Sequence, residues 1–223
     1  MQAKFDPRHY QLGALSSLLG FGVCILDFEV QPLAALLSVS AALVAQTIGD
    51  RSLGRPFDPK SALISALSIA LLLRANHPAW IGLASALAVS SKFLLRYRGK
   101  QVFNPSLFGI AALLGMTDAV WVSAGQWGSG AIFRLAASCL GLIVITRSKR
   151  ADITWAFLLA AIALRRARSA WLGDPLEIPL HALSNGSFLI FAIFMISDPK
   201  IIPDSRPARV LFAGTVAALS LWL

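Results

Sequence analysis

Residues 61–95 read SALISALSIALLLRANHPAWIGLASALAVSSKFLL, two apolar runs (61–75 and 79–95) joined by a short polar break. Each run approaches the length of a transmembrane helix, since a straight bilayer crossing takes about 20 apolar residues. Similar runs recur along the chain and predict about nine spans: 12–28, 32–48, 61–75, 79–95, 105–122, 130–146, 152–170, 180–197 and 208–223. Because several are shorter than a straight crossing, we expect short or interrupted helices. The predicted fold class is all-α, a polytopic transmembrane helical bundle of roughly eight to ten spans.

The composition predicts a single integral membrane domain over residues 1–223. The chain is 57% hydrophobic and 14% charged, whereas soluble domains carry about 25% charged residues. A soluble fold could not cover that much apolar surface, so we expect the lipid bilayer to be a partner. Basic cytoplasmic loops explain the net charge of +9, and without an aromatic–basic RNA-binding pattern we expect no nucleic-acid partner.

The basic residues also predict the orientation of the chain. With successive loops assigned to alternate sides, most of the 20 Lys and Arg residues fall on the side of the N-terminus. Cytoplasmic loops are enriched in Lys and Arg, so this bias predicts a cytoplasmic N-terminus and an outer C-terminus. Arg165, Arg166 and Arg168 fall on the outer side. Either this cluster is functional or one span is miscounted, and both interpretations stay open.

The segment from Lys92 to Gly109, KFLLRYRGKQVFNPSLFG, contains the most informative break between spans. Asn104 is a good N-cap, and Pro105 suits the first helical turn, where its missing N–H is not needed. A helix that begins here near membrane depth would direct free backbone N–H groups at an anion or polar ligand. An ordinary capped helix start is the alternative interpretation.

Three further positions are candidate site residues. Asp198 precedes Pro199 at the end of a span, where it could cap backbone N–H groups, pair with a nearby Lys or Arg, or contact a ligand. Asn185 lies in a small, polar break (Ser-Asn-Gly-Ser) within an apolar segment, where a helix could unwind or pack closely. Ser129 lies in Gly128–Ile132 (GSGAI), which by itself predicts only a helix start.

Motifs of several enzyme and metal classes do not occur in the sequence. Cys24 and Cys139 lie in apolar runs without a CxxC partner, and the three His residues are scattered, so no metal site is predicted. Neither GxGxxG nor GxxxxGK[ST] occurs, and no nucleophile triad or carboxylate pair is visible. Whether the protein is an enzyme is therefore left open.

Together these segments resemble the RnfD/NqrB family, the membrane subunits of Rnf and sodium-pumping quinone reductase complexes. The family pattern is FNPA, then SGAT, then TDP with a downstream proline and arginine. In this chain three features match in order. The first is Lys92 with Gly99, followed by Phe103-Asn104-Pro105-Ser106 and Gly109. The second is Ser129-Gly130-Ala131, and the third is Ser197-Asp198-Pro199 with Pro203 and Arg209. The resemblance covers roughly residues 50–215.

The resemblance implies a bacterial inner-membrane protein with a helical fold related to urea and ammonium channels. Such folds have inverted repeats and interrupted helices, and in this chain the repeats are expected at about 50–115 and 147–219. Members carry flavins and pass electrons across the membrane in step with ion movement. The cofactor-binding residues expected here are Phe103, Asn104, Pro105, Ser129, Asn185 and Asp198.

One departure from the family pattern changes the expected cofactor. The threonine of SGAT takes FMN through a phosphoester bond, but the matching position here is Ile132, which has no hydroxyl. Covalent FMN is therefore not expected, and noncovalent FMN or riboflavin is the alternative. The chain resembles a short, stand-alone relative of the family.

Three functions follow as hypotheses. The first is an electron-transport protein that holds a flavin or quinone noncovalently, with aromatics such as Phe103 and Phe108 against the ring. The second is a transporter or channel for a small solute, with a polar pathway past Asn104, Asn185 and Asp198. The third is a non-catalytic membrane partner that docks other proteins, such as redox-complex subunits or further copies of itself, through its basic inner face.

Overall fold

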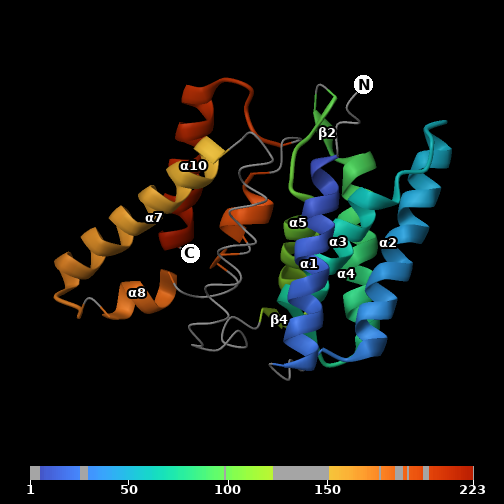
Figure 1. Cartoon of the computed structure of the whole chain (residues 1–223), viewed down its shortest axis with the longest axis horizontal. Helices are drawn as coiled ribbons and strands as arrows, with labels where there is room; N and C mark the ends of the chain where they lie inside the picture. Colours follow the sequence, from blue (N-terminus) through green and yellow to red (C-terminus); the bar gives the residue numbers. More distant parts are fainter. Residues whose placement is uncertain are drawn as a thin grey trace. The chain divides into compact units, whose positions relative to one another are not determined.

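The structure is a computed structural model that describes residues 6–25, 30–97, 99–122, 151–175, 177–183, 188–189, 191–197 and 201–222. Contacts divide the chain into two compact units, Met1–Gln126 and Trp127–Leu223 (Figure 1). The described residues are mostly α-helical, which confirms the all-α class.

The structure describes five helices in the N-terminal unit, and each begins at a proline. They are α1 (Pro7–Cys24), α2 (Pro32–Ser52), α3 (Pro59–Leu72), α4 (Pro78–Leu94) and α5 (Pro105–Met116). Proline suits this position because its fixed φ is helical and the N–H it lacks would have no partner within the helix. Side chains of the residues before α1, α3, α4 and α5 accept hydrogen bonds from the first turn; these residues are Asp6, Asp58, His77 and Asn104. The Xaa-Pro breaks in the sequence therefore mark the helix starts.

Four short strands are described in this unit: β1 follows α3, β2 and β3 lie between α4 and α5, and β4 follows α5. β1 (Leu73–Ala75) pairs antiparallel with β4 (Val120–Val122), and β2 (Arg96–Tyr97) pairs with β3 (Lys100–Gln101). Figure 1 shows β2 at the end of the unit where α1 begins and β4 at the other end. β1 and β4 lie where the predicted spans 61–75 and 105–122 end, so both spans finish as extended chain rather than helix. Strands of two or three residues have no periodic signal, which is why the sequence pattern did not predict them.

Small residues allow the helices of this unit to pack closely. α4 packs against both α2 and α5, and α2 also packs against α3. A buried cluster of Ala42, Ala62, Ala66 and Val89 fills the space between α2, α3 and α4. Gly109 of α5 lies so close to α4 that a Cβ there would be 2.3 Å from the Ala84 carbonyl oxygen.

The surface of α2 is more apolar than its buried face. Its buried residues are Ser38, Ala42, Gln46 and Asp50, while Leu36 and Ile48 are 65% and 61% exposed. In the described residues α2 alone is both long and apolar enough to cross a membrane, whereas α3, α4 and α5 are apolar but shorter. The predicted short helices are thus present, and the bundle of about nine membrane spans remains a prediction.

The C-terminal unit contains two long helices that lie side by side with their N-terminal ends together. Its described elements are α7 (Ala151–Leu172), α8 (Glu177–Leu183), the π-helical turn η2 (Phe191–Met195) and α10 (Arg206–Trp222). α7 packs along α10, and Arg209 on α10 donates from Nε to Asp152 Oδ2 on α7 at 2.8 Å. Phe157 is buried in the core and lies 5.2 Å from Phe191, ring centroid to ring centroid.

The predicted spans correspond to these elements in different ways. Spans 152–170 and 208–223 fall on α7 and α10, whereas 180–197 is divided between the end of α8 and η2. Span 130–146 lies outside the described residues. In the predicted repeat α3 corresponds to α7, but α3 has 14 residues and α7 has 22. The repeat stays a prediction.

Candidate functional site

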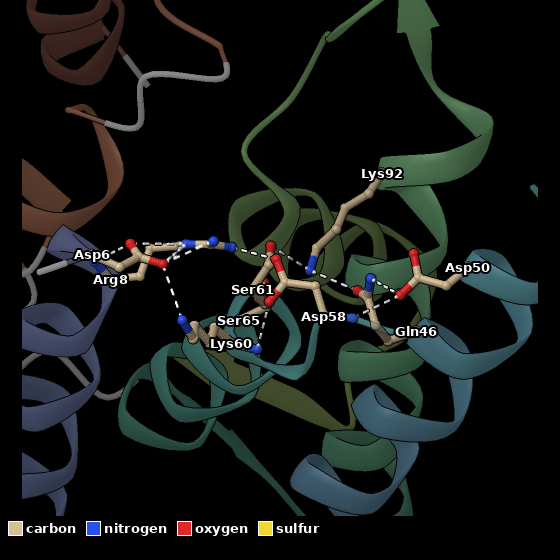
Figure 2. A network of polar contacts seen from close by, with 9 residues as sticks. All are labelled: Asp6, Arg8, Gln46, Asp50, Asp58, Lys60, Ser61, Ser65 and Lys92. Atoms are coloured by element: carbon tan, nitrogen blue, oxygen red, sulfur yellow. Dashed lines mark hydrogen bonds and ion pairs between the residues drawn. The ribbon is translucent and has the colours of Figure 1, made fainter. Parts of the chain in front are cut away.

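A buried polar network lies at the end of the N-terminal unit that contains Lys92 (Figure 2). α2 supplies Gln46 and Asp50, which are 5% and 6% exposed. These two residues are four positions apart on the inward face of α2, so their side chains lie one turn apart along the same stripe. The first turn of α3 and the last turn of α4 complete the network with Ser61 and Lys92.

The Lys92 ammonium group lies inside this network. Lys92 is 5% exposed, and its Nζ donates to Ser61 Oγ at 3.1 Å and to Gln46 Oε1 at 3.5 Å. Burying an ammonium group is costly unless acceptors surround it. Its place in the last turn of α4 also helps, because helix C-termini carry a partial negative charge. These contacts explain how the helix can turn this lysine inward.

Asp50 is connected to Lys92 through one amide. Gln46 Nε2 donates to Asp50 Oδ2 at 2.9 Å, and the backbone N–H of Asp58 donates to the same oxygen at 3.2 Å. The Gln46 amide thus accepts from an ammonium group and donates to a carboxylate. This arrangement can hold two opposite charges inside the unit without direct contact between them.

A second, more exposed group of charges joins the start of α1 to the start of α3. Arg8 forms ion pairs with Asp6, at 2.9 Å, and with Asp58, and Lys60 Nζ lies 3.2 Å from Asp6 Oδ2. The Arg8 side-chain hydrogen bond is the main cause that lowers the pKa of Asp6 below its usual range. These side chains are 26–41% exposed, so solvent screens the pairs and each adds little stability.

Hydroxyl groups form a further polar contact deeper between the helices. Ser38 on α2 donates to the Ala66 carbonyl oxygen of α3 at 3.0 Å, and its Oγ lies 2.6 Å from Ser85 Oγ on α4. Ser38 and Ser85 are fully buried. The polar side chains on the inner face of α2 therefore contact both α3 and α4.

The structure places three of the predicted site residues side by side at the start of α5. Asn104 is 8% exposed, and its Oδ1 accepts from the backbone N–H groups of Ser106 and Leu107 at 3.0 and 3.3 Å. Pro105 is buried in the first turn. Phe103 is 51% exposed, with its ring 5.8 Å from that of Phe108. Asn104 thus has the capping geometry expected from the Asn-Pro sequence, and Phe103 presents an open aromatic surface beside it.

The other predicted site residues cannot be compared with this arrangement. Ser129, Asn185 and Asp198 lie outside the described residues, as does Ile132. Within the described ranges, no three His, Cys, Asp or Glu side chains come together as a metal-ligand set.

Gln46, Asp50 and Ser38 are not predicted as site residues from the sequence. Residues 32–48 form one apolar span in the sequence pattern, and Lys92 falls among the loop charges. The signal that could have found them is their spacing, because Ser38, Gln46 and Asp50 recur at multiples of four in an otherwise apolar helix. Polar groups on one stripe of a membrane helix usually face the interior of a bundle.

Comparisons with known proteins assign the chain to no family. No protein-family model matches the chain, and no curated protein matches its sequence significantly. The RnfD/NqrB resemblance therefore rests on the motif residues alone and stays a prediction.

Proposed function

We propose that this chain is an integral membrane protein of the RnfD/NqrB type that takes part in electron transport, with a flavin or quinone held noncovalently. The observation that carries the proposal is that four residues of the Lys92–Gly109 segment have defined structural roles. Lys92 is buried among acceptors, and Asn104 caps α5. Gly99 turns the β2–β3 hairpin at a φ of +82°, and Gly109 allows close contact between α5 and α4.

The arrangement of polar and apolar residues on α2 supports the membrane location. A soluble helix buries its apolar residues and exposes its polar ones. α2 does the reverse, with Gln46 and Asp50 buried and Leu36 and Ile48 exposed. Lipid is the environment that favours such an outer surface, and buried charges in a membrane helix suggest a functional role.

The start of α5 is the place we propose for the cofactor. Phe103 is an exposed aromatic side chain next to the buried N-terminus of α5, where a flavin or quinone ring could stack on it. A noncovalent cofactor also agrees with Ile132, which offers no hydroxyl for a phosphoester bond.

The visible spectrum of the protein purified in mild detergent tests this proposal. We expect flavin absorbance near that of free FMN, or its appearance when FMN or riboflavin is added, and a quinone in the lipid extract if no flavin is found. Phe103→Ala should weaken binding, whereas Leu94→Ala, which removes an exposed side chain from α4, should not. A colourless protein that binds neither FMN, riboflavin nor a quinone would refute the proposal.

A second candidate function is transport of a small solute. The observation that favours it is the set of buried polar side chains between α2, α3 and α4, which includes Ser38, Gln46 and Lys92. Liposome flux with candidate solutes tests it, together with the Gln46→Leu and Asn104→Ala variants. Flux that is the same in both variants as in the wild type would argue against a pathway along these residues.

The proposed location is the bacterial inner membrane, with a cytoplasmic N-terminus and other redox subunits or further copies of the chain as partners. The Lys92 end of the N-terminal unit carries the exposed basic side chains Arg51, Arg55, Arg96 and Lys100, as a cytoplasmic surface would. A non-catalytic docking role predicts that redox subunits co-purify with the chain while no cofactor does.

A further inference from the structure

An open groove lies between α7 and α10 near the C-terminal ends of both helices. Its volume is about 400 Å³. One face of α7 forms most of its wall, because the lining residues of this helix recur at spacings of three and four positions, and α10 contributes one residue. The lining consists of Leu164, Ala167, Arg168, Trp171, Leu172 and Leu221. The groove is therefore apolar apart from one guanidinium group and one indole N–H.

The guanidinium group of Arg168 is available at the edge of this groove. Arg168 and Arg166 are both exposed, and among the described residues neither makes a hydrogen bond or an ion pair. Arg165, in contrast, lies over the Phe188 ring, 5.7 Å from its centroid. Asp174 lines a neighbouring recess with Arg165 and Arg168 without pairing with either. A guanidinium group in this state can bind a phosphate through two parallel donors.

The position of Arg168 along α7 fits the headgroup level of a bilayer. Asp152 and Arg209 form an ion pair where α7 and α10 begin, and Trp171 is about 29 Å farther along α7. This distance is close to the hydrocarbon thickness of about 30 Å. Trp171 is 89% exposed, and tryptophan is enriched at the headgroup level. Arg168 lies one turn before Trp171, from where its long side chain can reach the headgroups.

We propose that this groove binds an anionic phospholipid, with the lipid phosphate on Arg168 and one acyl chain along Leu164, Ala167 and Leu221. The apolar wall favours a lipid over a free phosphate compound, because only an acyl chain would cover it. The positive charge of Arg166 and Arg168 favours an anionic headgroup over a zwitterionic one. The inference rests on the membrane location proposed above, but not on electron transport.

Competition between two lipids for the purified full-length chain in detergent tests the groove. Brominated lipid quenches the fluorescence of a tryptophan that it contacts, so the quenching constants of brominated phosphatidylglycerol and brominated phosphatidylcholine give the lipid preference. We expect the wild type to prefer phosphatidylglycerol, and Trp171→Phe to lose most of the quenching that depends on the headgroup. Arg168→Gln should lower the preference by about fivefold, equivalent to about 1 kcal/mol. Arg168→Lys, which keeps the charge, should lower it less.

Two matched variants separate the groove from its surroundings. Arg166→Gln removes the same charge from the same helix outside the groove, so it should change the preference little. Ala167→Phe fills the groove without a change of charge, and it should lose the phosphatidylglycerol that the wild type retains through purification, as measured by mass spectrometry of the lipid extract. Ala163→Phe is its control, because Ala163 is also exposed on α7 but does not line the groove.

Recovery of the protein in carbonate-washed membranes distinguishes failure of this inference from failure of the membrane location. A protein that remains in these membranes but shows no preference for phosphatidylglycerol would overturn the lipid site alone, whereas a protein that is absent from them would overturn both proposals. Equal losses in Arg168→Gln and Arg166→Gln would mean diffuse attraction to charged headgroups and would overturn the groove. A quinone retained in place of phosphatidylglycerol, and lost in Ala167→Phe, would also overturn the lipid site and assign the groove to the electron-transport proposal.

Discussion

At the scale of single residues, the contact from Lys92 through Gln46 to Asp50 connects two buried opposite charges. The Lys92 ammonium reaches the Gln46 carbonyl oxygen, and the Gln46 amide nitrogen reaches the Asp50 carboxylate. Removal of one charge leaves the other buried with fewer partners, which costs more than the pair is worth when intact. The two residues should therefore depend on each other energetically although they do not touch.

A double-mutant cycle measures this dependence. Lys92→Met and Asp50→Asn should each lower the free energy of unfolding, and the double variant should lose less than the sum, with a coupling of about 0.5–3 kcal/mol. Repeating the cycle with Gln46→Leu should reduce the coupling, because the bridging amide is gone. Denaturation of the detergent-solubilised protein gives these free energies, with Lys100→Met as a control since Lys100 is exposed on β3. If the losses in unfolding free energy are additive while Gln46 is present, the Gln46 amide does not couple Lys92 to Asp50.

Gly109 is the residue at which a single methyl group should matter most. A Cβ there would lie 2.3 Å from the Ala84 carbonyl oxygen and 2.9 Å from the Ala88 Cβ, so helix α4 itself would have to move. Gly109→Ala should destabilise the protein by about 1–3 kcal/mol through overpacking. Gly115→Ala is the matched control in the same helix, because nothing lies within 4 Å of a Cβ there, and alanine's higher helix propensity should leave stability unchanged or raised. Equal thermal stability of the two variants would contradict the close contact.

The structural role of a single residue could be predicted from the sequence where it depends only on neighbouring residues. The Asn104-Pro105 pair predicted a capped helix start, and Asn104 Oδ1 caps α5 as expected. The burial of Lys92 and its contact with Gln46 could not be predicted in the same way, because they join positions 46 residues apart in the sequence. Counting Lys and Arg residues to orient the chain places every lysine in a loop. Lys92 is buried because α4 packs against α2 at this end of the unit.

At the scale of elements, Xaa-Pro pairs determine where the helices of the N-terminal unit begin. The capped starts at Asp58-Pro59 and Asn104-Pro105 lie at the same end of the unit as β2 (Figure 1). A cap satisfies backbone N–H groups that the helix cannot satisfy itself. Both α3 and α5 are therefore stabilised at the end where polar chain meets the bundle.

Loss of the α5 cap should have a measurable cost. Asn104→Ala removes both capping bonds of a buried side chain and should lower stability by about 0.5–2 kcal/mol, whereas Asn104→Asp should retain much of the cap. Gln31→Ala is the matched control, because Gln31 is the N-cap of α2 but makes no side-chain capping bond. Thermal unfolding monitored by circular dichroism in detergent compares the three variants. If Gln31→Ala costs as much as Asn104→Ala, the capping bonds are not the cause.

At the scale of the whole molecule, the lengths of α3 and β1 bear on how the N-terminal unit could span a membrane. α3 has 14 residues and is therefore about 21 Å long. β1 has three residues and adds about 10 Å as extended chain. Their sum is close to the hydrocarbon thickness of about 30 Å. Extended backbone is tolerated at membrane depth only where its polar groups are paired or covered by protein. β1 meets this condition through its pairing with β4 and the burial of Leu73 and Arg74.

This argument predicts that the two ends of the N-terminal unit lie on opposite sides of the membrane. In a Cys24→Ser, Cys139→Ser background, Arg55→Cys marks the Lys92 end and Asn76→Cys marks the Arg74 end, and both positions are exposed. A membrane-impermeant maleimide should label Asn76→Cys in intact spheroplasts and Arg55→Cys only after permeabilisation, since basic loops stay in the cytoplasm. Labelling of both positions from the same side would mean that α3 with β1 does not cross. The exposed apolar side chains of α2 would then need a protein partner rather than lipid to cover them.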